Sequence, residues 1–169
     1  MPFVLRPEPH PTLRPEGEYL QRTWSQSVLP LARQMGVPIT LPKVSPQPHT
    51  HLAFEGYQDA KEHGKGNEYN RRVLKAFFVE GQDVGQINVL TKLAGEIGLN
   101  EKEFEEALRT RKYRQVHQQA LRHAYEEAHI EAVPTFFIGK QRLAGLPSKE
   151  ALGAVIEEEL KSQENSTPR

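Results

Sequence analysis

The residues from Ile130 to Gly139 read IEAVPTFFIG, and they mark a change of pattern in the chain. Before this stretch, apolar residues recur every three to four positions, which is typical of helices. From Val133 onward, β-branched and aromatic residues follow one another, which predicts a strand. Gly139 and Lys140 then form a turn, and residues 141–144 return as the second strand of a hairpin. A helix follows the hairpin, with Ser148 as its N-cap.

Upstream of the hairpin the sequence is mainly helical. A short apolar run at residues 2–5 predicts a first strand, and two proline-rich segments, 6–15 and 37–48, predict extended connections. The periodicity predicts a helix over 16–35 that is kinked at Pro30 and ends at Gly36. Further helices are expected at about 51–63, 68–80, 86–97, 100–108 and 114–129. This order indicates an α/β or α+β protein with a helical insertion.

Composition excludes several classes of protein. The chain has 169 residues, which suits one domain, and its 22 basic and 22 acidic residues give a formal net charge of zero. A nucleic-acid binder would show a basic excess. No apolar run approaches the roughly 20 residues that span a bilayer. The short apolar start does not resemble a signal peptide, so we expect a cytoplasmic protein with no nucleic-acid or membrane partner.

The candidate site at this stage is the tripeptide Val133-Pro134-Thr135. A proline that opens a strand costs no hydrogen bond of the sheet. A cis bond, available almost only before proline, makes a sharp corner and leaves the backbone N–H and C=O of the preceding residue free. We therefore expect a cis Pro134 and an extended ligand at this corner. From the tripeptide alone, a trans proline at a strand start is an equally weighted alternative.

The wider context resembles the DsbA-like branch of the thioredoxin superfamily, in particular FrnE-type disulfide oxidoreductases and isomerases. In that fold a Val-Pro-Thr turn with a cis proline opens the third core strand, and a hairpin and a helix complete the half. Similar segments occur along nearly the whole chain: residues 2–8, 50–53, 75–78, 93–99 and the hairpin. The resemblance implies a thioredoxin-like α/β core of DsbA type with an inserted helical domain.

One departure from the family pattern is large. In the family, a first strand and a helix that carries the Cys-x-x-Cys pair precede the Pro-Phe-x-Leu segment, and here only Met1 does. Such a βα unit needs roughly 25 residues. We expect the N-terminal βα unit to be absent rather than mutated. The expected organisation is 1–15 and 130–161 as parts of the thioredoxin-like core, 16–129 as the helical insertion and 162–169 as a flexible tail.

The cysteine count limits the chemistry. Thiol–disulfide exchange needs a thiolate, and the chain has no cysteine, so no catalytic residue is assigned and we expect no redox activity from this chain. No cofactor is expected. The resemblance implies that Val133, Pro134 and Thr135 bind an extended peptide or a small-molecule thiol. A purely structural corner is the evenly weighted alternative.

Histidines and aromatic residues are weaker candidates. The pair His49 and His51 has metal-binding spacing but no third ligand, since His63 is twelve residues away, so we expect a solvated pair and no metal site. Spacings of six place His117, His123 and His129 on different helical faces. The side chains that could line a ligand groove, but for which core packing is favoured, are Trp24, Tyr69, Phe77 and Phe78.

Three functional hypotheses stay open. The chain is an oxidoreductase-type protein that lacks its reactive unit through a late start, trimming or decay, or it is a non-catalytic module that binds a peptide or partner. Alternatively, it is an isomerase or transferase of the kappa-glutathione-transferase type whose catalytic serine would lie upstream. The DNA before Met1 distinguishes them. Without a central strand, both faces and an edge of the hairpin need cover, so we expect a homo-oligomer or a strand-swapped dimer.

Overall fold

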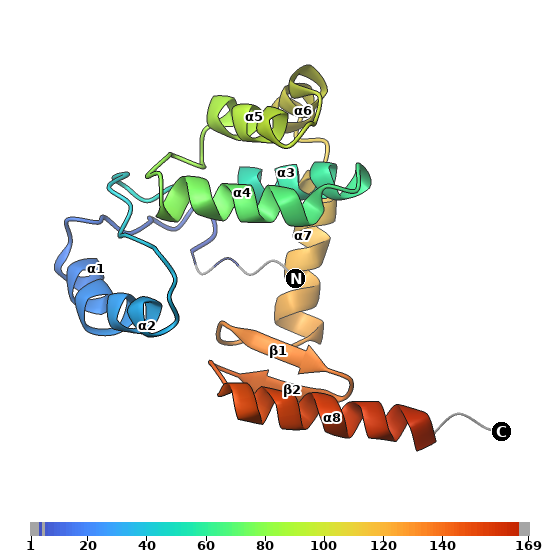
Figure 1. Ribbon diagram of the computed structural model, residues 1–169. Helices are drawn as coiled ribbons and strands as arrows, with labels where there is room; N and C mark the ends of the chain where they lie inside the picture. Colours follow the sequence, from blue (N-terminus) through green and yellow to red (C-terminus); the bar gives the residue numbers. More distant parts are fainter. Residues whose placement is uncertain (1–3, 5, 166–169) are drawn as a thin grey trace. The chain divides into compact units, whose positions relative to one another are not determined.

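The computed structural model describes Val4 and residues 6–165, and it divides into two compact units, residues 1–121 and 122–169. The first unit is helical, and the second carries a β-hairpin and the last helix (Figure 1). The first unit contains α1 (Glu18–Thr23), the π-helical segment η1 (Trp24–Val28), α2 (Leu29–Gln34), α3 (His51–Glu62), α4 (Gly66–Phe78), α5 (Ile87–Glu96), α6 (Glu101–Arg109) and α7 (Arg114–Arg122). The second contains the π-helical segment η2 (His123–Glu127), β1 (Thr135–Ile138), β2 (Gln141–Ala144) and α8 (Lys149–Asn165).

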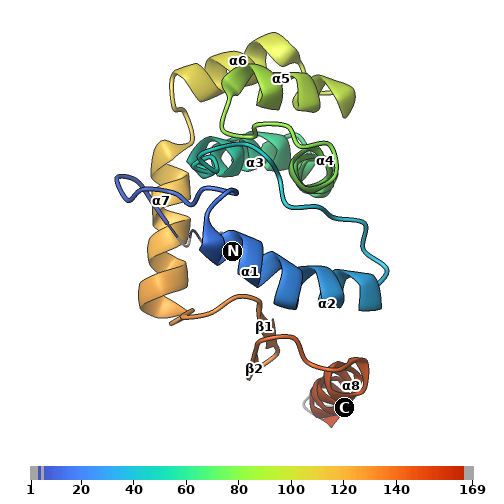
Figure 2. The same ribbon diagram turned by 90° about the vertical axis from the view of Figure 1, so that its left-hand side faces the viewer.

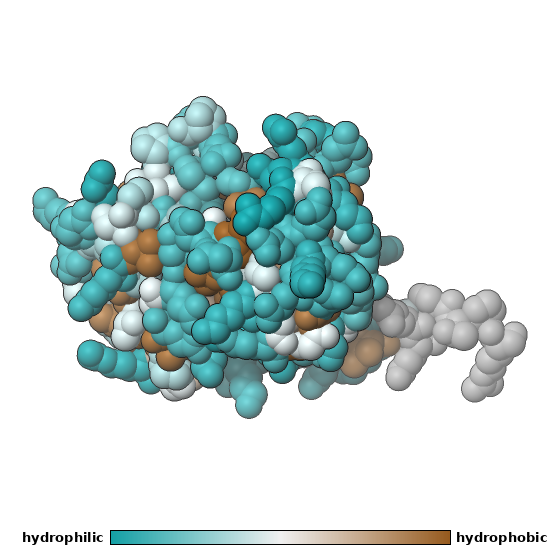
Figure 3. Space-filling view, turned by 90° about the horizontal axis from the view of Figure 1, so that it is seen from above, coloured by the Kyte–Doolittle hydropathy of each residue, from teal (hydrophilic) through white to brown (hydrophobic). Residues whose placement is uncertain are grey.

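The core of the first unit lies between two layers of helices. α3 and α4 lie side by side, and α5 and α6 pack against them (Figures 1 and 2). Each helix carries an apolar stripe that faces the others. The large apolar side chains that are fully buried are Tyr69, Leu90, Leu93, Phe104 and Leu108. The outer surface over α5 and α6 is mainly hydrophilic, with small separate hydrophobic patches (Figure 3).

The connection from α5 to α6 follows the sequence prediction. Gly98 ends α5 with a φ of 85°, a left-handed conformation that glycine adopts without strain. The side-chain oxygen of Asn100 then accepts hydrogen bonds from the backbone N–H groups of Lys102 (3.0 Å) and Glu103 (3.3 Å). The Asn100 N-cap is therefore confirmed, and it satisfies two donors that the first turn of a helix leaves unpaired.

The helix expected over residues 16–35 forms as α1, η1 and α2. Pro30 has no N–H group, so it cannot donate to the carbonyl four residues earlier. The irregularity lies in the π-helical turn just before it, where the Leu29 N–H bonds to the Trp24 carbonyl. Gly36, with a φ of 67°, ends the helix as predicted.

The apolar spacing over residues 114–129 predicts a buried apolar stripe, and the structure differs from this. Val116 on α7 is 46% exposed, and Tyr125 on η2 is also exposed. His117 is buried instead, with its ring stacked on Phe54 at 5.3 Å between centroids. The core-facing stripe therefore passes through a histidine, which an apolar count does not detect.

In the second unit, β1 and β2 form an antiparallel hairpin with Phe136 opposite Leu143. Gly139 makes the turn with a φ of 54°. The backbone N–H of Lys140 bonds to the Glu159 carboxylate, which joins α8 to the hairpin. The Ser148 hydroxyl accepts a hydrogen bond from the Ala151 N–H at 3.1 Å, so the predicted cap forms, and α8 continues past residue 161 to Asn165.

The strand expected at residues 2–5 lies mainly outside the described residues. Val4, the described member of that run, is in neither a helix nor a strand. Of the predicted tail, residues 166–169 are likewise outside the described part. Within the described part, no helix combines the length and the apolar character needed to cross a membrane.

Candidate functional site

The Val133–Thr135 corner lies on the surface of the second unit. The peptide bond between Val133 and Pro134 is cis. Two hydrogen bonds within the second unit stabilise the corner. The Thr135 hydroxyl donates to the Ala132 carbonyl at 2.6 Å, and the Gly145 N–H donates to the Pro134 carbonyl at 2.8 Å. The carbonyls on both sides of Val133 are therefore already paired within the unit.

Val133 itself differs from its neighbours. Among the described residues, neither its backbone N–H nor its C=O has a hydrogen-bond partner, and the residue is 49% exposed. In an antiparallel sheet, two opposed residues exchange both of their N–H···O=C bonds. A single residue with both groups free can therefore pair with one residue of an extended chain. The corner offers this pair of backbone groups beside the start of β1.

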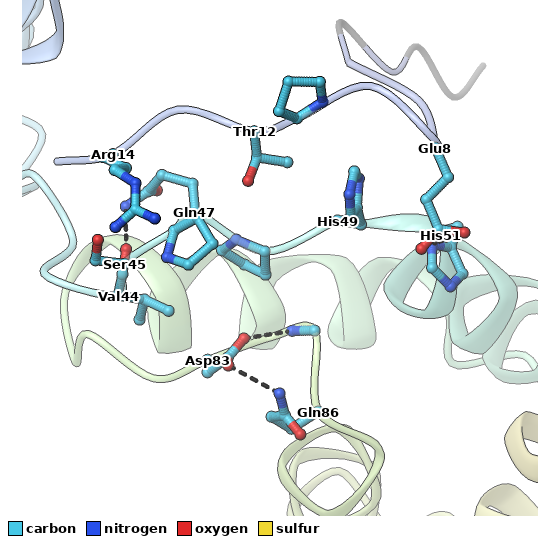
Figure 4. Close-up of a pocket in the computed structure, with 14 residues that line it drawn as sticks. Glu8, Thr12, Arg14, Val44, Ser45, Gln47, His49, His51, Asp83 and Gln86 are labelled. Atoms are coloured by element: carbon cyan, nitrogen blue, oxygen red, sulfur yellow. Dashed lines mark hydrogen bonds and ion pairs between the residues drawn. The ribbon is translucent and has the colours of Figure 1, made fainter. Parts of the chain in front are cut away.

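A second recessed region lies in the first unit, where the N-terminal segment runs alongside residues 44–51 (Figure 4). The Gln47 N–H donates to the Leu13 carbonyl at 2.8 Å, which joins the two segments. The Gln47 side chain donates to the Val44 carbonyl within its own segment. The groove has a volume of about 640 Å³. Asp83 forms its far wall and accepts bonds from the Gly85 N–H and the Gln86 side chain (Figure 4).

Two neighbouring cavities adjoin this groove at His49, which lines all three. One of about 280 Å³ is polar, and its wall includes Glu55, Arg111 and His117. The other, of about 510 Å³, is largely apolar. Of the aromatic residues weighed as groove or core, Tyr69 is in the core, as favoured. Trp24 is also buried and Phe77 packs against the core, and both line the apolar cavity together with Phe78.

The histidines do not gather as a metal site. The rings of His49 and His51 lie 6.4 Å apart, and no group of three potential ligands among the described residues could hold a metal ion. His63 lies elsewhere, with its Nδ1 3.6 Å from the Asp59 carboxylate. His123 pairs with Glu127 on the second unit. His117, on α7, lines the polar cavity together with His49 and His51.

A buried ion pair forms one wall of the polar cavity. Glu55, on α3, is 1% exposed, and both of its oxygens accept hydrogen bonds from Arg111, at 2.8 Å from Nε and 2.7 Å from Nη2. Arg111 has a φ of 56°, an uncommon conformation for a residue other than glycine. The bidentate pair holds this strained backbone in place and neutralises the buried carboxylate.

Burial favours the neutral form of two histidines of the cavity, the buried His117 and the partly buried His51. Burial lowers the pKa of His51 below its ordinary 6.5, and the nearby Glu8 carboxylate only partly offsets this. Burial likewise lowers the pKa of His117, with Glu55 acting in the opposite direction. A neutral imidazole has one donor and one acceptor nitrogen, so each ring can form hydrogen bonds of both kinds.

The hairpin with its proline corner, followed by a capped helix and preceded by a helical unit, defines a thioredoxin-like fold of DsbA type. Residues 3–157 match the DsbA-like thioredoxin domain, and the chain belongs to this family. The fold class and the family expected from the sequence are therefore confirmed.

Similar proteins agree with this assignment. The chain is 51% identical over 164 residues to YwbO of Bacillus subtilis (strain 168), an uncharacterized protein, covering 96% of this chain and 82% of YwbO. A 2-hydroxychromene-2-carboxylate isomerase has a similar fold, with a TM-score of 0.71, 16% identity, and coverage of 89% of this chain and 72% of the isomerase. The cytosolic disulfide reductase DsbM of Pseudomonas aeruginosa, solved with GSH, has a TM-score of 0.63, 20% identity, and coverage of 91% and 81%. At these identities the two structures establish the fold.

Proposed function

We propose that this chain supplies the substrate-holding part of a protein of the disulfide oxidoreductase and isomerase type. It binds an extended peptide through the backbone of Val133 and does not itself exchange disulfides. The free N–H and C=O of Val133, on a corner whose neighbouring carbonyls are already paired, are the observation that carries this proposal. The likeness to a disulfide reductase fold supports it.

The absence of thiol chemistry follows from composition. Disulfide exchange proceeds through attack of a thiolate on a sulfur atom, and the 169 residues include no cysteine. In an insulin-reduction assay, the chain should show no turnover above buffer. Turnover in a preparation free of contaminating oxidoreductases would contradict this part of the proposal.

Peptide binding is tested with two substitutions at one position. Val133→Pro removes the backbone N–H, whereas Val133→Ala shortens the side chain and keeps it. The probe is a short fluorescent peptide rich in Val and Thr, residues that favour an extended conformation. By anisotropy, V133P should bind about five- to tenfold more weakly than the unchanged chain, because one backbone hydrogen bond is lost and its partner is left unpaired.

V133A is the matched control and should bind within about twofold of the unchanged chain, since the pairing groups are intact. A V133P variant that is folded by circular dichroism and binds like V133A would overturn the proposal. If V133P does not fold, solvent exchange of the Val133 amide is measured in the unchanged chain. The proposal then requires slower exchange when peptide is added.

A further inference from the structure

The polar cavity of the first unit is lined by a buried histidine, His117, whose presence packing alone does not explain. His117 is 3% exposed, yet its Nδ1 has no hydrogen-bond partner. Leaving a buried polar group unpaired costs about 1–3 kcal/mol, so such groups call for an explanation. Phenylalanine at this position would keep the ring stack on Phe54 without that cost.

α7 turns one face toward the cavity. Arg114, His117, Gln118 and Leu121 all line it, and their spacings of three and four residues place them on the same side of the helix. Arg114 is exposed and forms no ion pair with any described residue. The face therefore presents an unpaired guanidinium one turn from an unpaired buried imidazole.

Arg111 also lines the cavity and adds further donors. Its Nε and Nη2 bond to Glu55, which leaves Nη1 without a partner among the described residues. The Glu55 pair fixes the plane and direction of this guanidinium before any ligand arrives. Because the Arg111 side chain is already held in place, little conformational entropy is lost when a ligand binds to it. A planar guanidinium group can form bidentate hydrogen bonds with a carboxylate.

Charge and size narrow the ligand class. Glu55 and Arg111 neutralise one another, so the other charged side chains among the described residues that line the cavity are Arg114 and the half-exposed Glu8, which lies 3.7 Å from His51. A cavity of about 280 Å³ is at the lower end of small-molecule sites. The cavity therefore suits a small ligand with one carboxylate group beside Arg111 and Arg114 and a small apolar part that packs against Leu121.

We propose that this cavity is a binding site for a small organic monocarboxylate, with Arg114 and Arg111 holding the carboxylate. The Nε2 of His117, which unlike Nδ1 is not enclosed, donates to or accepts from the ligand. The cavity belongs to the first unit, and this proposal does not depend on peptide binding at Val133.

Benzoate is the probe, and benzamide, which has nearly the same shape without the charge, is its matched control. In the full chain, benzoate should shift the His117 side-chain nitrogen resonances and raise the melting temperature. Benzamide should bind at least about tenfold more weakly, since charge-assisted hydrogen bonds exceed neutral ones by this margin. Equal binding of the two compounds, or no binding of benzoate up to its solubility limit, would overturn the proposal.

Three variants locate the site. Arg114→Gln and His117→Phe should each weaken benzoate about tenfold, and H117F should melt no lower than the unchanged chain because it removes an unpaired buried nitrogen. Arg71→Gln, an exposed arginine on α4 outside the cavity, should leave binding unchanged. Equal weakening by R71Q and R114Q would show general charge attraction and contradict the assignment. If H117F fails to fold, the exposed R114Q and its R71Q control decide the question.

Discussion

The two units of the chain differ in how they bury their apolar side chains. The first has a closed core in which Leu90, Leu93 and Leu108 are fully buried between helices. In the second, the buried apolar residues among those described are Ala124 and Ile130, and large apolar side chains stay exposed on the hairpin and α8. The proposed peptide corner thus lies on the unit with the smaller core. Stability and peptide recognition are therefore separable, and substitutions can test them one at a time.

The largest expected effect is on the ion pair of the first unit. Arg111→Met leaves the 1% exposed Glu55 carboxylate without its partner, and leaving such a buried charge uncompensated costs about 3–5 kcal/mol. Urea unfolding measures this loss. The double variant E55L/R111M removes both charges and should regain most of the stability. A double variant as unstable as R111M alone would show that the pair is not the cause.

A matched pair of leucines sharpens the contrast between the units. Leu93→Ala removes a side chain that is 0% exposed and should cost about 2–5 kcal/mol of unfolding free energy. Leu160 on α8 is 55% exposed, so Leu160→Ala should change the free energy of unfolding by no more than about 0.5 kcal/mol. The measurement is chemical denaturation followed by circular dichroism. Similar losses for both variants would contradict the difference in packing.

The exposed apolar residues of the second unit motivate a proposal about self-association. β1 pairs with β2 on one side, and the described residues offer it no second partner strand. Phe137 is 45% exposed on this strand. We propose that a second copy covers it, so sedimentation should show association that rises with concentration. Phe137→Lys should weaken association by about tenfold or more, given roughly 1.5–3 kcal/mol for a large apolar side chain.

The control for this variant is Arg142→Lys on the neighbouring strand β2, which preserves charge and should leave association unchanged. A chain that stays a monodisperse monomer at all concentrations, melts cooperatively and binds no apolar dye would refute the proposal. That result would show that the exposed side chains of the second unit need no cover from another chain.

The pH dependence of stability tests the two neutral histidines. Burial places the pKa of His51 and His117 below 6.5 in the folded chain, so the unfolded chain takes up protons first as pH falls. The free energy of unfolding should therefore fall as pH is lowered below about 6.5. The double variant His51→Gln, His117→Phe should flatten this part of the profile. An unchanged slope in the double variant would contradict the attribution.

Local signals in the sequence predicted much of the fold. Asn100 and Ser148 cap their helices, and Gly98 and Gly139 adopt the positive φ that a stop or a turn requires, because each depends on neighbours within a few residues. The proline corner was likewise predictable from a strand that opens with Val133-Pro134-Thr135 together with the family resemblance.

The polar cavity could not be predicted in the same way. Glu55 and Arg111 are 56 residues apart, and no local pattern links them. The spacing of six between His117 and the next histidines does not indicate the cavity, because the residues that line it with His117 on α7 include Arg114 and Leu121. Their spacing of three and four residues was present in the sequence, but a mixed polar and apolar stripe resembles an ordinary exposed face.

Peptide binding at Val133 is tested by a nitrogen-edited NMR titration that follows the Val133 backbone amide as the Val- and Thr-rich peptide is added. We expect this amide to shift and to exchange more slowly with solvent, while the amides of Leu90 and Leu93 in the core stay unchanged. An unperturbed Val133 amide in the presence of bound peptide would contradict the proposal, because the proposed pairing requires its N–H to donate to the peptide.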